Sequence, residues 1–267
     1  MHRFRKRIKR FFSELIPAGK VKERLKCKFY NLANPDCIFE IETGVYIMKK
    51  EGVFVKGHQD FYSINTSVNR YLSFYKPRLG DFVLDAGSHV GQLSLYFSAL
   101  VGREGRIFSF EPDDLNRRSQ NENLKVNSDL SSQIEIDARL LWDSEKDLYF
   151  EELGGVASSV GSSDALTSVK KKSTSIDLWI EERRIDHLDF VKMDIEGAEI
   201  EAILGAEKTI RTLTPNFAIA SYHVVRGAKT YKWLEEYFGS IRYPFKTVFF
   251  NDGEIITYAG PAIDSRV

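Results

Sequence analysis

Short apolar runs alternate with helical patterns along most of the chain after residue 80. Predicted strands cover residues 82–86, 106–110, 133–137, 188–193 and 216–221, and predicted helices cover residues 91–101, 113–126, 199–211 and 228–238. Strands that alternate with helices at this spacing are joined by right-handed crossovers, which make the strands parallel and cover both faces of the sheet with helices. The pattern therefore predicts an α/β fold.

The last part of this region departs from the alternation. The β-rich runs Thr247–Phe250 and Glu254–Tyr258 flank Asn251-Asp252-Gly253, and Asp-Gly between two such runs is a strong hairpin signal. We expect this hairpin to complete a mostly parallel seven-stranded sheet. Residues 153–168, rich in Gly and Ser, predict a loop that either covers a ligand or simply crosses the surface.

The region before residue 80 has short β-type runs separated by glycine-containing turns. These runs are Ile38–Ile41, Val45–Met48 and Val53–Val55, and they predict a small antiparallel meander. Residues 66–75 predict a helix that Pro77 and Gly80 close. We therefore divide the chain into a basic segment (1–28), a small β-rich and helical extension (29–78) and a main domain (79–267).

The net charge of zero conceals an uneven distribution. Residues 1–28 hold eleven Lys or Arg against Glu14 and Glu23, a formal charge of +9, so the remaining residues carry −9. An acidic main domain argues against nucleic acid as the partner of its active face.

Residues 1–16 carry an apolar stripe at helical spacing, opposed by six basic residues. The stripe consists of Phe4, Ile8, Phe11, Phe12 and Leu15. A basic amphipathic helix with this pattern either lies on an anionic membrane surface or packs its stripe on its own domain. Both interpretations stay open, as does a partly disordered start.

Nothing in the sequence predicts a membrane span or a secreted protein. No apolar run reaches the roughly 18 to 20 residues that cross a bilayer. The basic start leads only into Phe11-Phe12, which is too short for a secretory signal. Cys27 and Cys37 have neither metal-site spacing nor the density of a disulfide scaffold. We expect a cytoplasmic protein, peripheral to the membrane if residues 1–16 bind one.

Two adjacent predicted strands each end in an acid. The first runs into Asp85-Ala-Gly-Ser-His-Val-Gly91 and the second into Phe110-Glu-Pro112. The carboxyl ends of neighbouring parallel strands form nucleoside pockets, where Glu111 can accept both hydroxyls of a ribose. A dinucleotide fingerprint would need glycine at position 89, where this chain has His89. The motif therefore predicts a nucleoside without phosphates, and S-adenosylmethionine (SAM) is the candidate.

A second group of acids follows the strand that ends at Met193. Asp194, Glu196 and Glu199 lie there, and His223 follows the next strand. Burying like charges together is costly unless they meet a cation, donors or water, so the clustering indicates a functional site. We assign Glu199 to the first turn of the following helix, where acids favour the macrodipole. Glu196 fits either role.

Together these motifs resemble the FkbM family of SAM-dependent methyltransferases. The resemblance covers residues 80–223 and rests on Val83–Gly91, Phe110–Pro112, Asn123–Asn127, Ser175–Asp177 and Lys192–Glu199 with Gly205-Ala206. The first two segments alone would indicate only the Rossmann-like class I methyltransferase fold, and the block Lys192–Glu199 makes the resemblance specific. It implies O-methylation of a hydroxyl on a sugar, glycolipid or other small polar acceptor. The chain departs from the family at His89, often Asn, and at Ala220-Ser-Tyr-His223, which replaces a glutamate-containing strand end on the acceptor side.

Methyl transfer from a sulfonium is an in-line displacement that needs positioning and removal of a proton from the acceptor. We assign the amino-acid end of SAM to the backbone of Asp85, Ala86, Gly87, Ser88 and Gly91, its ribose to Glu111 with Pro112, and the border of its adenine to Asp137 and Ala138. Asp194 is expected beside the sulfonium and the acceptor, where it could orient the hydroxyl, act as base or hold a divalent cation. His223 is the preferred general base because the intrinsic pKa of histidine is near neutral, and Glu196 is a further catalytic candidate.

Two alternatives remain at this point. A nicotinamide-dependent oxidoreductase would use a related sheet, but it lacks the required glycine and leaves residues 192–199 unexplained. A catalytically inactive membrane-surface binding module would keep the fold, and the altered end of the fifth strand leaves room for it.

Overall fold

The computed structural model describes residues 17–154, 159–160 and 168–264. The chain forms two compact units, one ending at Ser67 and the other beginning at Val68, and the division falls inside helix α3 (Tyr62–Tyr71). The basic amphipathic stretch, residues 1–16, lies outside the described residues. Within the described ranges, no helix has the length and apolar character that crossing a membrane requires.

The first unit contains the predicted antiparallel meander. Its elements are α2 (Lys20–Ala33), β1 (Ile38–Glu42), β2 (Val45–Lys50) and β3 (Val53–Gly57), with the strands paired in that order. Both turns have two successive residues with positive φ, Thr43-Gly44 and Glu51-Gly52, as hairpins of this hand require. The helix predicted at 66–75 starts earlier, at Tyr62, where its N–H donates to Asp60 Oδ1 at 3.3 Å.

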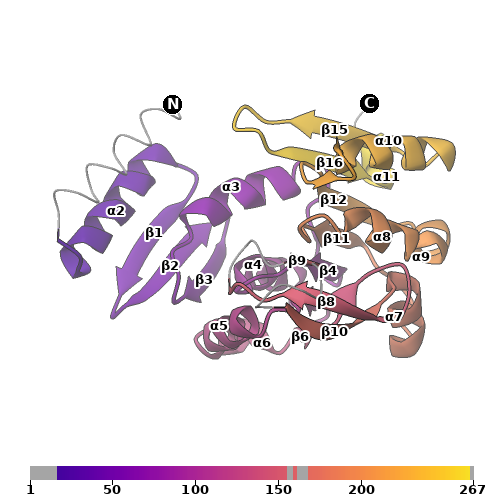
Figure 1. Ribbon diagram of the computed structural model, residues 1–267. Coiled ribbons are helices and arrows are strands. Elements are labelled where there is room, and N and C mark those ends of the chain that lie inside the picture. The colour runs from indigo at the N-terminus through magenta and orange to yellow at the C-terminus, as the bar shows by residue number, and fades with distance from the viewer. Residues whose placement is uncertain (1–16, 155–158, 161–167, 265–267) are drawn as a thin grey trace. The chain divides into compact units, whose positions relative to one another are not determined.

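The second unit is built on the predicted seven-stranded sheet (Figure 1). Its strands are β4 (Phe82–Ala86), β5 (Arg106–Phe110), β6 (Ile134–Asp137), β11 (Phe190–Met193), β12 (Asn216–Ala220), β15 (Phe245–Phe249) and β16 (Ile255–Ala259). Their spatial order is β15-β16-β12-β11-β4-β5-β6. The first five in sequence pair in parallel, and β16 pairs antiparallel with both β12 and β15. The predicted parallel sheet with a closing antiparallel hairpin is therefore confirmed.

Helices follow the strands in the predicted alternation. They are α4 (Gln92–Val101), α5 (Asp114–Lys125), α6 (Ser128–Ser131), α7 (Ile176–Arg183), α8 (Glu199–Leu204), α9 (Glu207–Thr212), α10 (Thr230–Ser240) and α11 (Pro261–Asp264). Ser175 caps α7 as expected, because its Oγ accepts the N–H of Leu178 at 3.1 Å.

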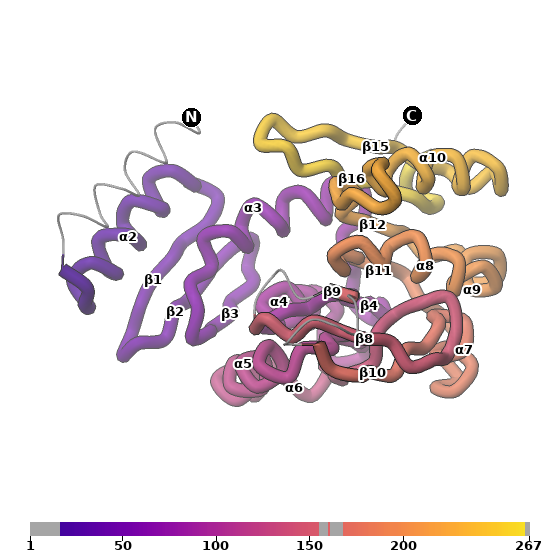
Figure 2. Tube along the Cα trace, in the orientation of Figure 1, coloured from indigo at the N-terminus to yellow at the C-terminus, as the bar shows by residue number. Residues whose placement is uncertain are grey.

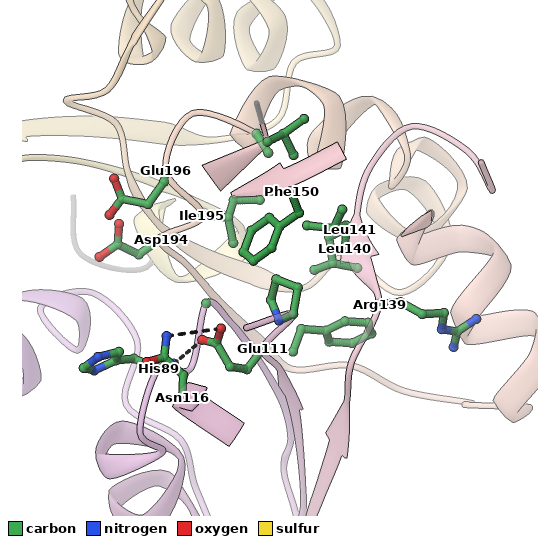
Figure 3. Close-up of a pocket in the computed structure, with 15 residues that line it drawn as sticks. His89, Glu111, Asn116, Arg139, Leu140, Leu141, Phe150, Asp194, Ile195 and Glu196 are labelled. Atoms are coloured by element: carbon green, nitrogen blue, oxygen red, sulfur yellow. Dashed lines mark hydrogen bonds between the residues drawn. The ribbon is translucent and has the colours of Figure 1, made fainter. Parts of the chain in front are cut away.

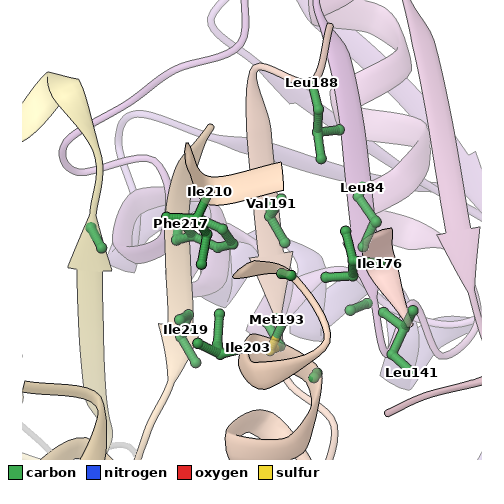
Figure 4. Close-up of a cluster of buried hydrophobic side chains, with 14 of the residues drawn as sticks. Leu84, Leu141, Ile176, Leu188, Val191, Met193, Ile203, Ile210, Phe217 and Ile219 are labelled. Carbon is green, nitrogen blue, oxygen red and sulfur yellow. The ribbon is translucent and has the colours of Figure 1, made fainter. Parts of the chain in front are cut away.

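Alternate residues of the central strands face two different layers. Leu84, Val191 and Phe217 belong to one buried cluster with residues from α7, α8, α9 and α10 (Figure 4). The intervening residues face the layer of α4, where the rings of Phe97 and Phe190 lie 5.9 Å apart. This alternation is the period of two that a strand imposes, and it puts every second strand residue in each layer.

A second, smaller sheet was not predicted. Its strands are β7 (Leu140–Leu141), β8 (Asp147–Glu151), β9 (Ser159–Val160) and β10 (Ser168–Thr174), in the order β7-β10-β8-β9. The trace in Figure 2 shows β10 running beside β8, which it pairs antiparallel. The stretch 153–168, predicted as a loop, contributes β9 to this sheet and is otherwise largely outside the described residues.

The helix predicted at 199–211 is two helices, α8 and α9, separated at Gly205-Ala206. The break has a packing reason. A Cβ on Gly205 would lie 2.2 Å from the carbonyl oxygen of Trp142, and the Gly205 carbonyl accepts the N–H of Asp177 at 2.9 Å. The segments that follow β7 and β10 therefore approach the helix where only glycine fits. A last short hairpin, β13 (Val224–Val225) and β14 (Ala228–Lys229), follows β12.

Candidate functional site

A pocket that is partly open to solvent lies at the carboxyl ends of β4, β5 and β11. Figure 3 shows the side chains that line it. The lining residues come from the strand ends and from the second sheet: Gly87, His89, Phe110, Glu111, Pro112, Asn116, Arg139, Leu140, Leu141, Phe150, Val160, Asp194, Ile195, Glu196 and Ala198. One wall is thus acidic and the facing wall is mostly apolar.

Glu111 is the buried acid of this pocket. Its Oε2 accepts the N–H of His89 at 2.7 Å and its Oε1 accepts the N–H of Asp113 at 2.9 Å, with the Asn116 amide 3.4 Å away (Figure 3). Burial raises the pKa of Glu111 to about 7, and the two backbone N–H groups only partly oppose that shift. An ionised carboxylate has about four acceptor positions, so further donors can still be accepted from the pocket side.

The loop after β4 is shaped by contacts within the protein. Gly87 has a φ of +73°, and a Cβ there would lie 1.9 Å from the carbonyl oxygen of Asp194. Gly91 also has positive φ, and a Cβ there would meet the side chain of Gln120. His89 has a φ of +53°, which points its N–H at Glu111. The two glycines thus let the loop seat against the end of β11 and against α5.

Asp85 is buried behind this loop and does not line the pocket. Its Oδ2 accepts the hydroxyl of Ser94 at 2.6 Å, and its Oδ1 lies 3.2 Å from Lys192 Nζ. Lys192 also donates to the carbonyl oxygens of Ala86 and Gly87, at 3.1 and 2.7 Å. The expected pairing of Lys192 with an acid is present. The Asp85–Lys192 pair holds the loop from below.

Asp137 and Ala138 follow β6, but neither lines the pocket. The carboxylate of Asp137 is bound by the guanidinium of Arg139, with an Nη2–Oδ2 distance of 2.8 Å, and Ala138 is exposed. Arg139 does line the pocket and also pairs with Glu182 at 2.9 Å. The sequence thus pointed to the correct strand end and missed the residue that borders the cavity.

The apolar wall was also missed. It consists of Leu140, Leu141, Phe150 and Val160, which belong to the second sheet. Two signals were available: the apolar run Leu140-Leu141-Trp142 directly after Asp137-Ala138, and the alternating residues of β8. Neither segment can be identified as a strand from the sequence alone, because each forms a strand by pairing with β10.

The second group of acids meets His223 beside the pocket. Nε2 of His223 lies 3.3 Å from Glu196 Oε2 and 3.8 Å from Asp194 Oδ1, and its Nδ1 lies 3.0 Å from Glu199 Oε1. Asp194 Oδ2 accepts the hydroxyl of Tyr71 at 3.0 Å. The three catalytic candidates, Asp194, Glu196 and His223, are therefore brought together, with Tyr71 as a partner that the sequence did not indicate.

Glu199 does more than occupy a first helical turn. Its side chain is fully buried, and its Oε1 accepts the N–H groups of Ile195 and Gly197, each at 3.2 Å. The same oxygen is the one that contacts His223 Nδ1. Glu199 thus orders the turn after β11 and faces the imidazole from behind.

The side chains of this group change one another's pKa values. Burial by itself would lower the pKa of His223, but Glu196, Glu199 and Asp194 outweigh it and raise the pKa to about 10. Burial raises the pKa of Asp194, while Lys192 and His223 oppose that rise. Burial, followed by the charge of Asp194, raises the pKa of Tyr71 well above its usual range, so this hydroxyl remains a donor.

The predicted cofactor residues therefore fall into two sets. Those that line the pocket are Gly87, Glu111, Pro112 and Asp194, and those that lie behind or beside it are Asp85, Ala86, Ser88, Gly91, Asp137 and Ala138. Within the second set, residues 85–91 form the loop after β4 or support it. Ala86, for example, accepts the N–H of Asp194 at 3.1 Å, and the N–H of Ser88 donates to the carbonyl oxygen of Phe110 at 3.1 Å.

Comparison with known proteins agrees with this architecture. The model of the methyltransferase FkbM domain matches residues 85–244. No curated protein matches the sequence at a significant level. Among solved structures, the methyltransferase FkbM from Methylobacillus flagellatus KT has a TM-score of 0.54 and 20% identity; the match covers 70% of this chain and 45% of that one.

Fibrillarin from Aeropyrum pernix, solved with natively bound S-adenosyl-L-methionine, has 16% identity and a TM-score of 0.43, over 84% of this chain and 98% of that one. The match with the Methylobacillus protein covers less than half of that protein's length. At this level of identity, the likeness to that protein establishes the fold, which is that of the Rossmann-like class I methyltransferases.

Proposed function

The chain belongs to the FkbM methyltransferase family, and we propose that it transfers a methyl group from SAM to a hydroxyl of a sugar, glycolipid or other small polar acceptor. The observation that carries this proposal is the pocket at the ends of β4, β5 and β11. There a buried carboxylate, Glu111, faces an apolar wall, and Asp194 and Glu196 lie at the same edge of the sheet.

The residues present suit SAM in three respects. Glu111 has acceptor positions on the pocket side for two ribose hydroxyls. Leu141 offers aliphatic surface and Phe150 an aromatic ring, and a purine ring can pack against both. Among the described residues, Arg139 is the one arginine that lines the pocket, and it is already paired with Asp137 and Glu182, so this part of the chain offers no uncommitted guanidinium for a pyrophosphate. These features favour a nucleoside sulfonium over a dinucleotide.

When bound, SAM supplies an electrophilic methyl group for in-line displacement by an oxygen nucleophile. The chain has to position the acceptor hydroxyl and promote the loss of its proton. Asp194 lines the pocket, whereas His223 stands beside it, behind Asp194 and Glu196. We therefore assign contact with the acceptor to Asp194 and Glu196. The role of His223, earlier preferred as base, becomes that of holding these two acids.

The test combines binding and turnover on the full chain. Calorimetric titration with SAM and with its demethylated product, S-adenosylhomocysteine (SAH), should show micromolar binding. NAD⁺ should give no heat of binding. Incubation with SAM and a panel of glycans and glycolipids should then yield a product heavier by one methyl group, which the enzyme with Glu111→Gln forms more slowly.

Three results would change the assignment. Absence of binding by both SAM and SAH would overturn the methyltransferase proposal and favour an inactive module. Binding of NAD⁺ alone would favour the oxidoreductase. Methyl groups found on nitrogen of amino sugars, with free hydroxyls untouched, would keep the reaction type and overturn the acceptor class.

A further inference from the structure

Three side-chain atoms from different segments converge at the edge of the sheet. Oδ1 of Asp194, Oε2 of Glu196 and Nε2 of His223 come from the end of β11, the turn after it and the end of β12. All three atoms lie within 4.8 Å of one another. Two carboxylates and one imidazole at this separation are a donor set for one divalent metal ion.

The other polar atom of two of these side chains is already in contact with a buried neighbour. Tyr71 donates to Oδ2 of Asp194, and Glu199 Oε1 lies 3.0 Å from Nδ1 of His223. A carboxylate behind the second ring nitrogen is the usual way in which proteins orient a metal-binding histidine. Glu199 is itself fixed by the turn's N–H groups. The ring is therefore supported from behind, with Nε2 directed towards the two acids.

The atoms that face one another lack hydrogen bonds. The side chain of His223 is only 10% exposed. Among the described residues, neither ring nitrogen of His223 makes a hydrogen bond with acceptable geometry, the Nδ1 that contacts Glu199 included, and neither does Asp194 Oδ1. Buried polar atoms without partners are uncommon and call for an explanation, such as an ion.

The local charge points the same way. Three carboxyl groups, those of Asp194, Glu196 and Glu199, surround one imidazole, while Lys192 is engaged by Asp85 and by two carbonyl oxygens. Three acids this close are costly to bury without a further positive charge. An ion between Asp194, Glu196 and His223 would supply two.

We propose that Asp194, Glu196 and His223 bind a divalent first-row transition metal ion, Mn²⁺ or Zn²⁺ rather than Mg²⁺ or Ca²⁺, which holds the acceptor hydroxyl. The imidazole in the donor set decides between the two classes, since Mg²⁺ and Ca²⁺ prefer all-oxygen sites. With three protein ligands, the ion keeps positions open for a substrate oxygen. Asp194 and Glu196 also line the pocket, so the open positions are adjacent to it.

This inference rests on the proposed function and specifies how the acceptor is activated. A hydroxyl bound to the ion loses its proton to solvent more readily, as metal-bound water does. The alkoxide oxygen forms the new O–CH₃ bond while the S–CH₃ bond of SAM breaks. The products are the methyl ether, SAH and one proton.

The test is titration of metal-stripped full-length protein with Mn²⁺, followed by the electron paramagnetic resonance of the free ion and by calorimetry. Wild type should bind one Mn²⁺ per chain, displaceable by Zn²⁺. His223→Ala should weaken binding about tenfold or more, and Glu199→Gln, which removes the carboxylate behind the ring, should weaken it by about 10- to 100-fold. His187→Ala, at the opposite end of β11, is the matched control and should bind Mn²⁺ as wild type does.

SAH binding separates this inference from the proposed function. His223 does not line the pocket, so His223→Ala should keep SAH affinity while losing Mn²⁺. Should that variant fail to fold, Glu199→Gln provides the same comparison, because Glu199 does not line the pocket either. No saturable binding at millimolar Mn²⁺, or equal binding by the His223 and His187 variants, would overturn the metal site even if SAH binds. If wild type does not bind SAH, the proposed function is overturned instead.

Discussion

The affinity for SAH should depend on pH through one carboxyl group, that of Glu111. Burial raises its pKa to about 7, so about one tenth of the protein carries an ionised Glu111 at pH 6 and about nine tenths at pH 8. Ribose hydroxyls donate to the carboxylate more strongly than to the neutral acid. We therefore expect SAH to bind about tenfold more tightly at pH 8 than at pH 6, with little further gain above pH 8.

The same group changes the stability of the unliganded protein in the opposite direction. Its folded-state pKa is raised, so the stabilisation is fully present below the unfolded value of 4.5 and is lost as pH rises through 7. At 1.36 kcal/mol per pKa unit, the free energy of unfolding should fall by about 3 kcal/mol over that range on account of Glu111. SAH should recover part of it at pH 8.

The assay is calorimetric titration with SAH at several pH values between 6 and 8, in buffers of matched ionic strength. Glu111→Gln provides the control, because it keeps the size of the side chain and has no proton to titrate. The dependence that remains in this variant belongs to other groups, and the difference between the two proteins belongs to Glu111. Urea unfolding of both proteins at pH 5 and pH 8 measures the stability term.

Two results would refute the reasoning. If wild type and Glu111→Gln show the same pH dependence of SAH affinity, Glu111 does not accept hydrogen bonds from the ligand. If SAH binds more tightly at pH 6 than at pH 8 only in wild type, the neutral acid is the binding form and acts as a donor.

Three further predictions concern the support of the site. Gly87→Ala would put a methyl group into the carbonyl oxygen of Asp194, and we expect a loss of at least about 2 kcal/mol in the free energy of unfolding, together with loss of SAH binding in calorimetry. Lys192→Met leaves the buried Asp85 unpaired and should cost about 3 to 5 kcal/mol in urea unfolding, much of which Asp85→Asn in the same chain should restore. Ser175→Ala removes only the cap of α7 and should cost about 1 kcal/mol by the same measurement, with SAH affinity unchanged.

The main sheet could be predicted closely because its signals are local. β4 and β5 have the predicted bounds, since each is an apolar run that an acid and a glycine or proline end. β11 starts at Phe190 rather than residue 188, and Asp189, just before it, accepts the N–H of Phe82 with its carboxylate at 2.8 Å. Glu111 was predictable for the same reason, as its position at a strand end follows from the motif alone.

The rest of the site depends on pairings between distant segments. β10 contains three consecutive lysines and carries no apolar alternation, yet it pairs with β7 and β8 while Lys171 binds Asp114 and Glu152. Without that pairing, the apolar wall of the pocket cannot be derived. Tyr71 likewise reaches Asp194 from a helix more than a hundred residues earlier, and no local pattern marks it.

The close packing of Gly87 against Asp194 connects the proposed SAM pocket and the proposed metal site through one stretch of backbone. The Asp194 N–H donates to the Ala86 carbonyl oxygen, and Gly87 lies too close to the Asp194 carbonyl oxygen to leave room for a methyl group. Because of these contacts, we expect the loop after β4 and the acids after β11 to shift together. A ligand that orders the loop thereby also orders the acids. By thermodynamic linkage, the factor by which SAH changes the affinity for Mn²⁺ must equal the factor by which Mn²⁺ changes the affinity for SAH. The order in which the two ligands are added therefore cannot matter at equilibrium, and each becomes a quantitative probe of the other.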